Sequence, residues 1–214
     1  MTLDASGEVA FAVRSVEGAP PPQRPLEAYL LDGQQRMTSL YQCTSSRHPV
    51  VTQTSRKRPA KLHFYFNIRD ALGSNGARRD AILAVPEDRV LRENIRLDLS
   101  TAENEFMALH FPIDRIFDAQ LWIQDALAWT LQDIQTRQDH MRLINEFSMR
   151  VINNFNDYQL PVITLGRDTT RAAVCLVFEK VNTGGKALDA FELVTAMYAG
   201  QSFQLRDDWK GRRE

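Results

Sequence analysis

The side chains best suited to chemistry are concentrated in Asp32-Gly33-Gln34-Gln35-Arg36. A short apolar run at 29–31 precedes them and predicts a strand, and Met37, Leu40, Tyr41 and Thr44 follow at a spacing that predicts one buried face of a helix. Gly33 permits a tight turn or a close approach by a ligand. The start of a helix exposes unpaired N–H groups and the positive end of the helix dipole, which suit phosphate. Arg36 adds a forked donor for phosphate oxygens.

A plainer interpretation of this stretch is purely structural. Asp32 then caps the helix, and Arg36 pairs with a surface carboxylate. Because helix caps are common, an isolated Asp-Gly-x-x-Arg pattern favours this interpretation. The choice therefore depends on what the rest of the chain adds.

A second stretch, Asn182-Thr183-Gly184-Gly185-Lys186, places glycines at the end of a predicted helix. Val174, Val177, Phe178 and Val181 are spaced to form the buried face of that helix, and Glu179 lies on another face. A glycine-rich turn of this kind can cradle an anion. It lacks the spacing of a P-loop. On the structural alternative, Glu179 is a solvated helix residue and Asn182 only ends the helix.

Together the two stretches resemble the signatures of the GmrSD-type restriction family, whose N-terminal domain is similar to the ParB/sulfiredoxin-like superfamily. The first signature is Asp-Gly-Gln-Gln-Arg followed by Met-Thr-Ser-Leu, here residues 32–40. The second is Phe-x-x-x-Asn-x-Gly-Gly-x-x-Leu with a later Glu-Leu, matched from Phe178 to Leu193. The signatures occur in the family's order and span most of the chain.

The resemblance implies that both motifs line one pocket, which binds a nucleoside triphosphate together with Mg²⁺. The implied catalytic residues are Asp32, Arg36 and Glu179, and Asp32 is also the implied metal ligand. The implied nucleotide-binding residues are Gly33, Gln34, Gln35, Arg36, Asn182, Gly184, Gly185 and Lys186. Arg36 would stabilise charge that develops on the phosphoryl group.

The function implied by the resemblance is that of a regulatory domain in phage defence by modification-dependent restriction. Such a domain binds and hydrolyses nucleotide and acts with a nuclease domain or subunit and with DNA. This chain contains no recognisable nuclease motif. The alternative is a DNA-binding or protein-interaction module without hydrolysis, in which Arg36 and basic loops meet DNA phosphates.

Composition sets broad limits on these functions. The chain has 214 residues and a formal net charge of −1, so no overall basic field draws it to nucleic acid. Its two cysteines, Cys43 and Cys175, form no metal-binding or disulfide pattern. We see no signal peptide and no apolar run long enough to span a bilayer, and therefore expect a cytoplasmic protein without membrane partners.

The remaining patterns predict an α/β (or α+β) fold, and the resemblance implies that its mixed sheet has a ParB/sulfiredoxin-like core. Further strands are expected at 62–68, 81–85 and 158–165, with a helical insert at about 104–156. We expect one domain over residues 1–214, truncated at both ends.

Three further residues have side chains that could take part in catalysis. His63 lies in a predicted strand, and Asp139 and His140 lie on a predicted surface helix. Structural roles are favoured for all three.

Overall fold

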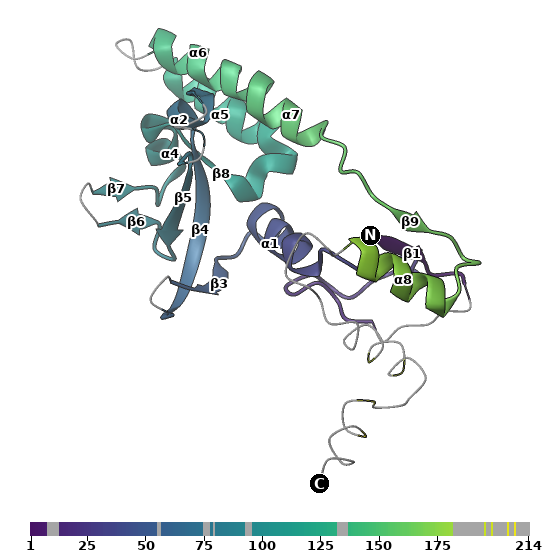
Figure 1. The fold of residues 1–214 in the computed structure, drawn as a ribbon. Helices are drawn as coiled ribbons and strands as arrows, with labels where there is room; N and C mark the ends of the chain where they lie inside the picture. The colour runs from purple at the N-terminus through teal and green to yellow at the C-terminus, as the bar shows by residue number, and fades with distance from the viewer. Residues whose placement is uncertain are drawn as a thin grey trace. The chain divides into compact units, whose positions relative to one another are not determined.

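A computed structural model describes residues 1–7, 13–54, 57–74, 78, 80–92, 96–131, 137–181, 195, 198, 205 and 208. The chain divides into two compact units, one formed by Met1–Thr38 with Leu160–Glu214 and the other by Ser39–Gln159. Each contains helices and strands (Figure 1), which confirms the predicted α+β class. The ParB/sulfiredoxin-like core stays a prediction.

The first unit is built on a small mixed sheet with β1 (Thr2–Asp4) at its centre. One neighbour, β2 (Ala28–Leu30), is antiparallel, and the other, β9 (Thr164–Leu165), is parallel. The helix α8 (Arg171–Val181) contributes Val174 to a core shared with Leu3 and Leu31. These three side chains are almost fully buried, so α8 packs against β1 and against the residue that follows β2.

The strand predicted over residues 158–165 is much shorter than expected. Only Thr164 and Leu165 pair with a neighbour, and the prediction is wrong for residues 158–163. Pro161 has no N–H to donate to a ladder. The apolar residues around it are more than half exposed, as expected for a segment without a strand partner: Tyr158, Leu160, Val162 and Ile163.

The second unit contains a four-stranded antiparallel sheet whose longest strand is β4 (Pro59–Asn67). One edge of β4 pairs with β5 (Ile82–Pro86). The other edge pairs first with β3 (Val50–Gln53) and then with β8 (His110–Pro112). A separate two-stranded ribbon is formed by β6 (Val90–Leu91) and β7 (Leu97–Asp98).

Helices enclose the larger core, at one end of this sheet (Figure 1). They are α2 (Ile68–Leu72), α4 (Ala102–Ala108), the 3₁₀ helix η1 (Ile113–Asp118), α5 (Ala119–Thr130), α6 (Arg137–Phe147), the π-helical turn η2 (Ser148–Ile152) and α7 (Asn153–Asn156). The ring of Trp122 packs edge-on against Phe106 and Phe111, each with 5.1 Å between ring centroids. Trp122 and Ala126 are both buried, so they lie on the face of α5 that packs against this core.

The helix after the first motif, α1 (Gln34–Thr44), differs from the expectation on one point. Of its predicted buried face only Thr44 is buried, whereas Met37 is 38% and Leu40 46% exposed. The helix is rich in Gln, Thr and Ser and carries few large apolar side chains. The spacing of its apolar residues therefore predicted a larger buried face than the helix has. Among the helices that can be described, none combines the length and apolar character needed to cross a bilayer.

Candidate functional site

The first motif lies where β2 ends and α1 begins. The backbone N–H groups of Leu31 and Asp32 both donate to the carbonyl of Met1, at 3.0 and 3.4 Å. Burial of Leu31 in the core then holds the chain in place immediately before the turn. Gly33 adopts φ +87°, which is a conformation that favours glycine. The strand, the turn and the helix start therefore agree with the local prediction from the sequence.

Gly33 is the residue that caps α1. Its carbonyl accepts the first helical hydrogen bond, from the N–H of Met37 at 2.9 Å. Because glycine has no side chain, it offers no oxygen to the N–H groups of Gln34, Gln35 and Arg36, which open the helix. Gly33, and not Asp32 as the structural interpretation predicted, is therefore the N-cap of α1. The N–H groups that open a helix and the positive end of the helix dipole suit an anion here.

Arg36 and Asp32 form an ion pair across this turn. The Nη2 atom of Arg36 lies 3.1 Å from Oδ2 of Asp32. The arginine side chain is 78% exposed, whereas that of Asp32 is only 17% exposed. The guanidinium also lies over Gly33, because a Cβ placed there would stand 3.5 Å from Nη2. The cation is thus held at the start of the helix and faces solvent.

The two glutamines of the motif differ in their surroundings. The Nε2 atom of Gln34 donates to the carbonyl of Leu30 at 3.3 Å, which ties the first helical turn to the end of β2. Gln35 is exposed. Gln34, Gln35 and Arg36 are all exposed and accessible to a ligand, and Gln34 has a structural contact in addition.

The second motif is described only up to its helix. Glu179 belongs to α8, but its side chain lies outside what the structure describes. The residues expected to bind nucleotide after that helix also lie outside the described residues: Asn182, Gly184, Gly185 and Lys186. The predicted meeting of Arg36 with Asn182 stays a prediction. The helix α8, which precedes these residues, belongs to the same compact unit as the first motif, and Leu31 and Val174 share its core.

Metal ligation was predicted at Asp32. Within the described part of the chain, no group of three His, Cys, Asp or Glu side chains is arranged to hold a metal ion. Mg²⁺ bound with a nucleotide does not require such a group, because it takes one or two carboxylates and completes its shell with phosphates and water. The partly exposed carboxylate of Asp32 is a suitable oxygen donor, so this residue fits the role.

A buried polar cluster in the second unit was not predicted from the sequence. Glu105 is 5% exposed and accepts hydrogen bonds from the Tyr65 hydroxyl at 3.2 Å and from Trp122 Nε1 at 2.9 Å. Arg89 approaches it at 3.5 Å. Burial raises the pKa of Glu105, although the three partners act in the opposite direction. Nothing in the spacing of these residues indicates that they meet, because they come from separate elements.

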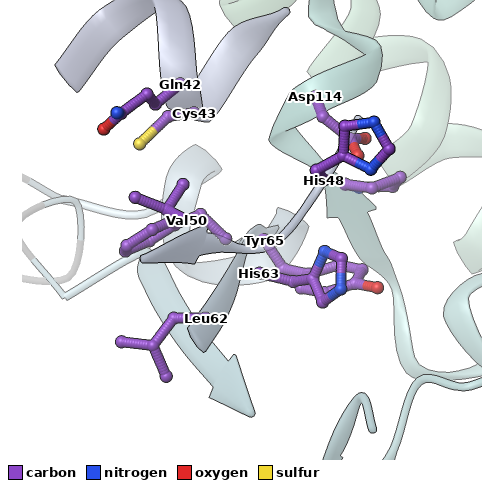
Figure 2. A pocket seen from close by; sticks show the side chains of 10 residues that line it. Gln42, Cys43, His48, Val50, Leu62, His63, Tyr65 and Asp114 are labelled. Carbon is purple, nitrogen blue, oxygen red and sulfur yellow. The ribbon is translucent and has the colours of Figure 1, made fainter. Parts of the chain in front are cut away.

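A small pocket also lies in the second unit, and its lining residues fall between Gln42 and Asp114 (Figure 2). The space inside that water can enter is about 10 Å³, close to the volume needed for one water molecule. That is far too little for a nucleotide. None of the motif residues 32–36 lines it.

The three residues for which structural roles were favoured have different surroundings. His63 lines this pocket. Arg69 and Arg142 bind Asp139, and the ring of Trp129 stacks on His140.

Comparison with known proteins gives one match. Residues 13–199 match the family model described as the N-terminal domain of the GmrSD restriction endonuclease. That range includes both motifs and most of the chain. No curated protein and no solved structure matches the chain significantly.

Proposed function

This chain belongs to the GmrSD restriction endonuclease N-terminal domain family, and from that premise we propose that it binds and hydrolyses a nucleoside triphosphate. The proposed site is the turn from Asp32 to Arg36. We further propose that hydrolysis regulates a nuclease domain or subunit in phage defence. The family supports the restriction context, and the geometry of the turn supports the choice of ligand.

One observation carries the proposal. An arginine that is 78% exposed is held at the N-terminus of an 11-residue helix whose capping residue has no side chain. A phosphate at this position receives backbone N–H donors, the helix dipole and a forked cation together. Each contribution favours an anion with several oxygens over a neutral ligand.

The ion pair with Asp32 does not oppose this role. The guanidinium end of the pair is 78% exposed, and a salt bridge to so exposed a partner contributes about 1 kcal/mol or less, so a phosphate can replace the carboxylate at the guanidinium at small cost. Asp32 then needs another cation, and Mg²⁺ accompanying the nucleotide would supply it. The bound ion would neutralise phosphate charge.

In the proposed reaction, the oxygen of a water molecule forms a bond to the γ-phosphorus, and the bond to the β–γ bridging oxygen breaks. The products are a nucleoside diphosphate, inorganic phosphate and a proton. Arg36 stabilises the charge on the phosphoryl oxygens. We propose that Glu179 positions the water and that Asn182, Gly184, Gly185 and Lys186 hold the remaining phosphates, because α8 is anchored beside the first motif.

The test is calorimetric titration of the chain with each of the four ribonucleoside triphosphates, with and without Mg²⁺, beside an assay of phosphate release. We expect saturable binding of at least one triphosphate, stronger with Mg²⁺, and slow phosphate release. The opposing result is no triphosphate binding together with tight DNA binding that falls steeply with salt. That outcome would favour the DNA-binding alternative.

A further inference from the structure

The sheet of the second unit has an interruption along one edge. On that edge β3 pairs with β4 as far as Leu62, and β8 begins to pair at Tyr65. The opposite edge of β4 pairs with β5 without a break from Leu62 to Phe66. His63 and Phe64 therefore have no strand neighbour on the interrupted side, and the small pocket of Figure 2 opens there.

An acceptor without a partner lines this pocket. Asp114 lies in η1, and its Oδ1 atom is buried without a hydrogen-bond partner among the described residues. Buried polar atoms are nearly always paired in folded proteins, so an orphaned carboxylate oxygen indicates that a donor belongs beside it. The neighbouring apolar walls, including Val50 and Pro112, provide no donor.

The other polar groups at the pocket include acceptors as well as the donor groups of Gln42 and Cys43. Burial and the nearby charge of Arg89 lower the pKa of His63, against the opposing influence of Asp114 and Glu87. A neutral imidazole keeps one nitrogen as an acceptor. His48 adds a second ring, and no lysine or arginine is among the residues that line the pocket.

The charged groups that influence His63 are Asp114, Glu87 and Arg89. Asp114 and Glu87 are acidic, and Glu105 lies behind Tyr65, where it approaches Arg89. Lys61 pairs with Glu87 at 3.0 Å, and Arg89 approaches Glu105 at 3.5 Å. Oδ1 of Asp114, by contrast, has no hydrogen-bond partner among the described residues, which favours a cationic occupant beside it.

We propose that this pocket binds a primary ammonium group, either that of a small free amine or the head of a lysine side chain. The space corresponds to about one water molecule, and an ammonium group is of similar size. Its N–H groups can donate to Asp114 Oδ1 and to imidazole nitrogen. Phosphate would bring more acceptors and negative charge. A transition metal is disfavoured, because the described residues form no three-ligand group. The site is independent of the proposed nucleotide site.

The test uses methylammonium chloride as the probe and the ring signals of His63 in NMR spectra as the readout. At constant ionic strength, we expect saturable shifts for His63 but not for His110, which does not line the pocket. Tetramethylammonium has no N–H and should cause no such shift. Asp114→Asn should weaken methylammonium binding about tenfold or more, as expected when a charged acceptor is lost.

Asp125→Asn is the matched control, because Asp125 is an exposed carboxylate of α5 outside the pocket. It should bind methylammonium as the wild type does. Thermal melts of both variants should stay close to that of the wild type, since Oδ1 of Asp114 has no partner to lose. Equal binding by Asp114→Asn and the wild type, or equal shifts with tetramethylammonium, would overturn the proposal.

N-acetyl-lysine methylamide distinguishes the two sources of the ammonium group. Tighter binding of this amide than of methylammonium would identify a lysine side chain of a partner protein as the occupant. Binding of methylammonium alone would identify a small free amine. Zn²⁺ binding that shifts His48 and His63 together, without any amine binding, would replace the proposal by a metal site.

Discussion

At the residue scale, the pairing of Arg36 with Asp32 bears on both interpretations of the first motif. The structural interpretation expected a surface carboxylate beside Arg36, and the carboxylate is Asp32 itself. Asp32 stands four residues before Arg36 and immediately before the capping residue Gly33, so the spacing in the sequence allows this pair. Because the guanidinium itself is 78% exposed, it stays available to a ligand, which is why the contact agrees with phosphate binding.

Substitution of Gly33 should destabilise the protein, because of the backbone conformation of this residue. With φ at +87°, Gly33→Ala places a Cβ in the left-handed region and should lower the free energy of unfolding by about 1–2 kcal/mol. The added methyl group would only contact the guanidinium of Arg36, at 3.5 Å, so no clash adds to this cost. Urea denaturation of the variant measures the change.

Gly166→Ala is the matched control for that prediction. Its Cβ would meet no atom within 4 Å, and its φ is not positive. We expect little change or a gain of about 0.4–1 kcal/mol, because alanine restricts the unfolded chain. Equal losses in both variants would show that the conformation of Gly33 is not what requires glycine.

At the element scale, Tyr65 joins β4 to α4 through its hydrogen bond with Glu105. Tyr65→Phe removes that donor from a buried carboxylate and should reduce the free energy of unfolding by about 1.5–3 kcal/mol. Tyr158→Phe is the control, because this side chain is 70% exposed. Chemical denaturation should show little change for the control, and an equal effect of both substitutions would contradict the role of the network.

Glu105 should also make stability depend on pH. Burial raises its pKa in the folded state above the ordinary value of 4.5, so the protonated form is the one that folding favours. Its contribution is therefore complete below pH 4.5 and is lost as pH rises through the folded pKa. The stability difference between wild type and Glu105→Gln should shrink as pH rises from 4.5. A difference that grows over this range, in urea denaturation at several pH values, would contradict this sign.

Local patterns predicted elements better than they predicted contacts between elements. The strand at 62–68, the strand at 81–85 and the helix after Gly33 all occur near their expected positions. Of the strand expected at 158–165, only Thr164 and Leu165 form one. A strand needs a neighbour to pair with, and Pro161 has no N–H to donate. The pocket and the Glu105 cluster depend on strand register and on packing between distant segments. Single-sequence periodicity carries no information about either.

At the scale of the whole molecule, the segment 39–159 is continuous in the sequence and contains its own core. The fifteen buried residues of the larger cluster all lie between Ile68 and Ile152. We therefore expect a fragment of residues 39–159 to fold alone and to melt cooperatively, as followed by circular dichroism. A fragment without a thermal transition would show that this core needs the rest of the chain.

The proposed function belongs to the other unit, so this fragment is also a functional control. It contains the pocket at Asp114 but none of the residues 32–36. If it folds, it should not bind a nucleoside triphosphate. Affinity retained in the fragment would place the nucleotide outside the first motif.

The most direct measurement is calorimetric titration of Mg²⁺ and nucleoside triphosphate into the wild type and two arginine variants. Arg36→Ala should lose roughly 2–4 kcal/mol of binding free energy or bind too weakly to detect, and Arg36→Lys should already be impaired because it loses the fork. Arg92→Ala should bind as the wild type does, because Arg92 forms a similar exposed pair, with Asp88, far from the motif in sequence. Thermal melts of both alanine variants should stay near that of the wild type. Undiminished binding by Arg36→Ala would contradict the proposed site.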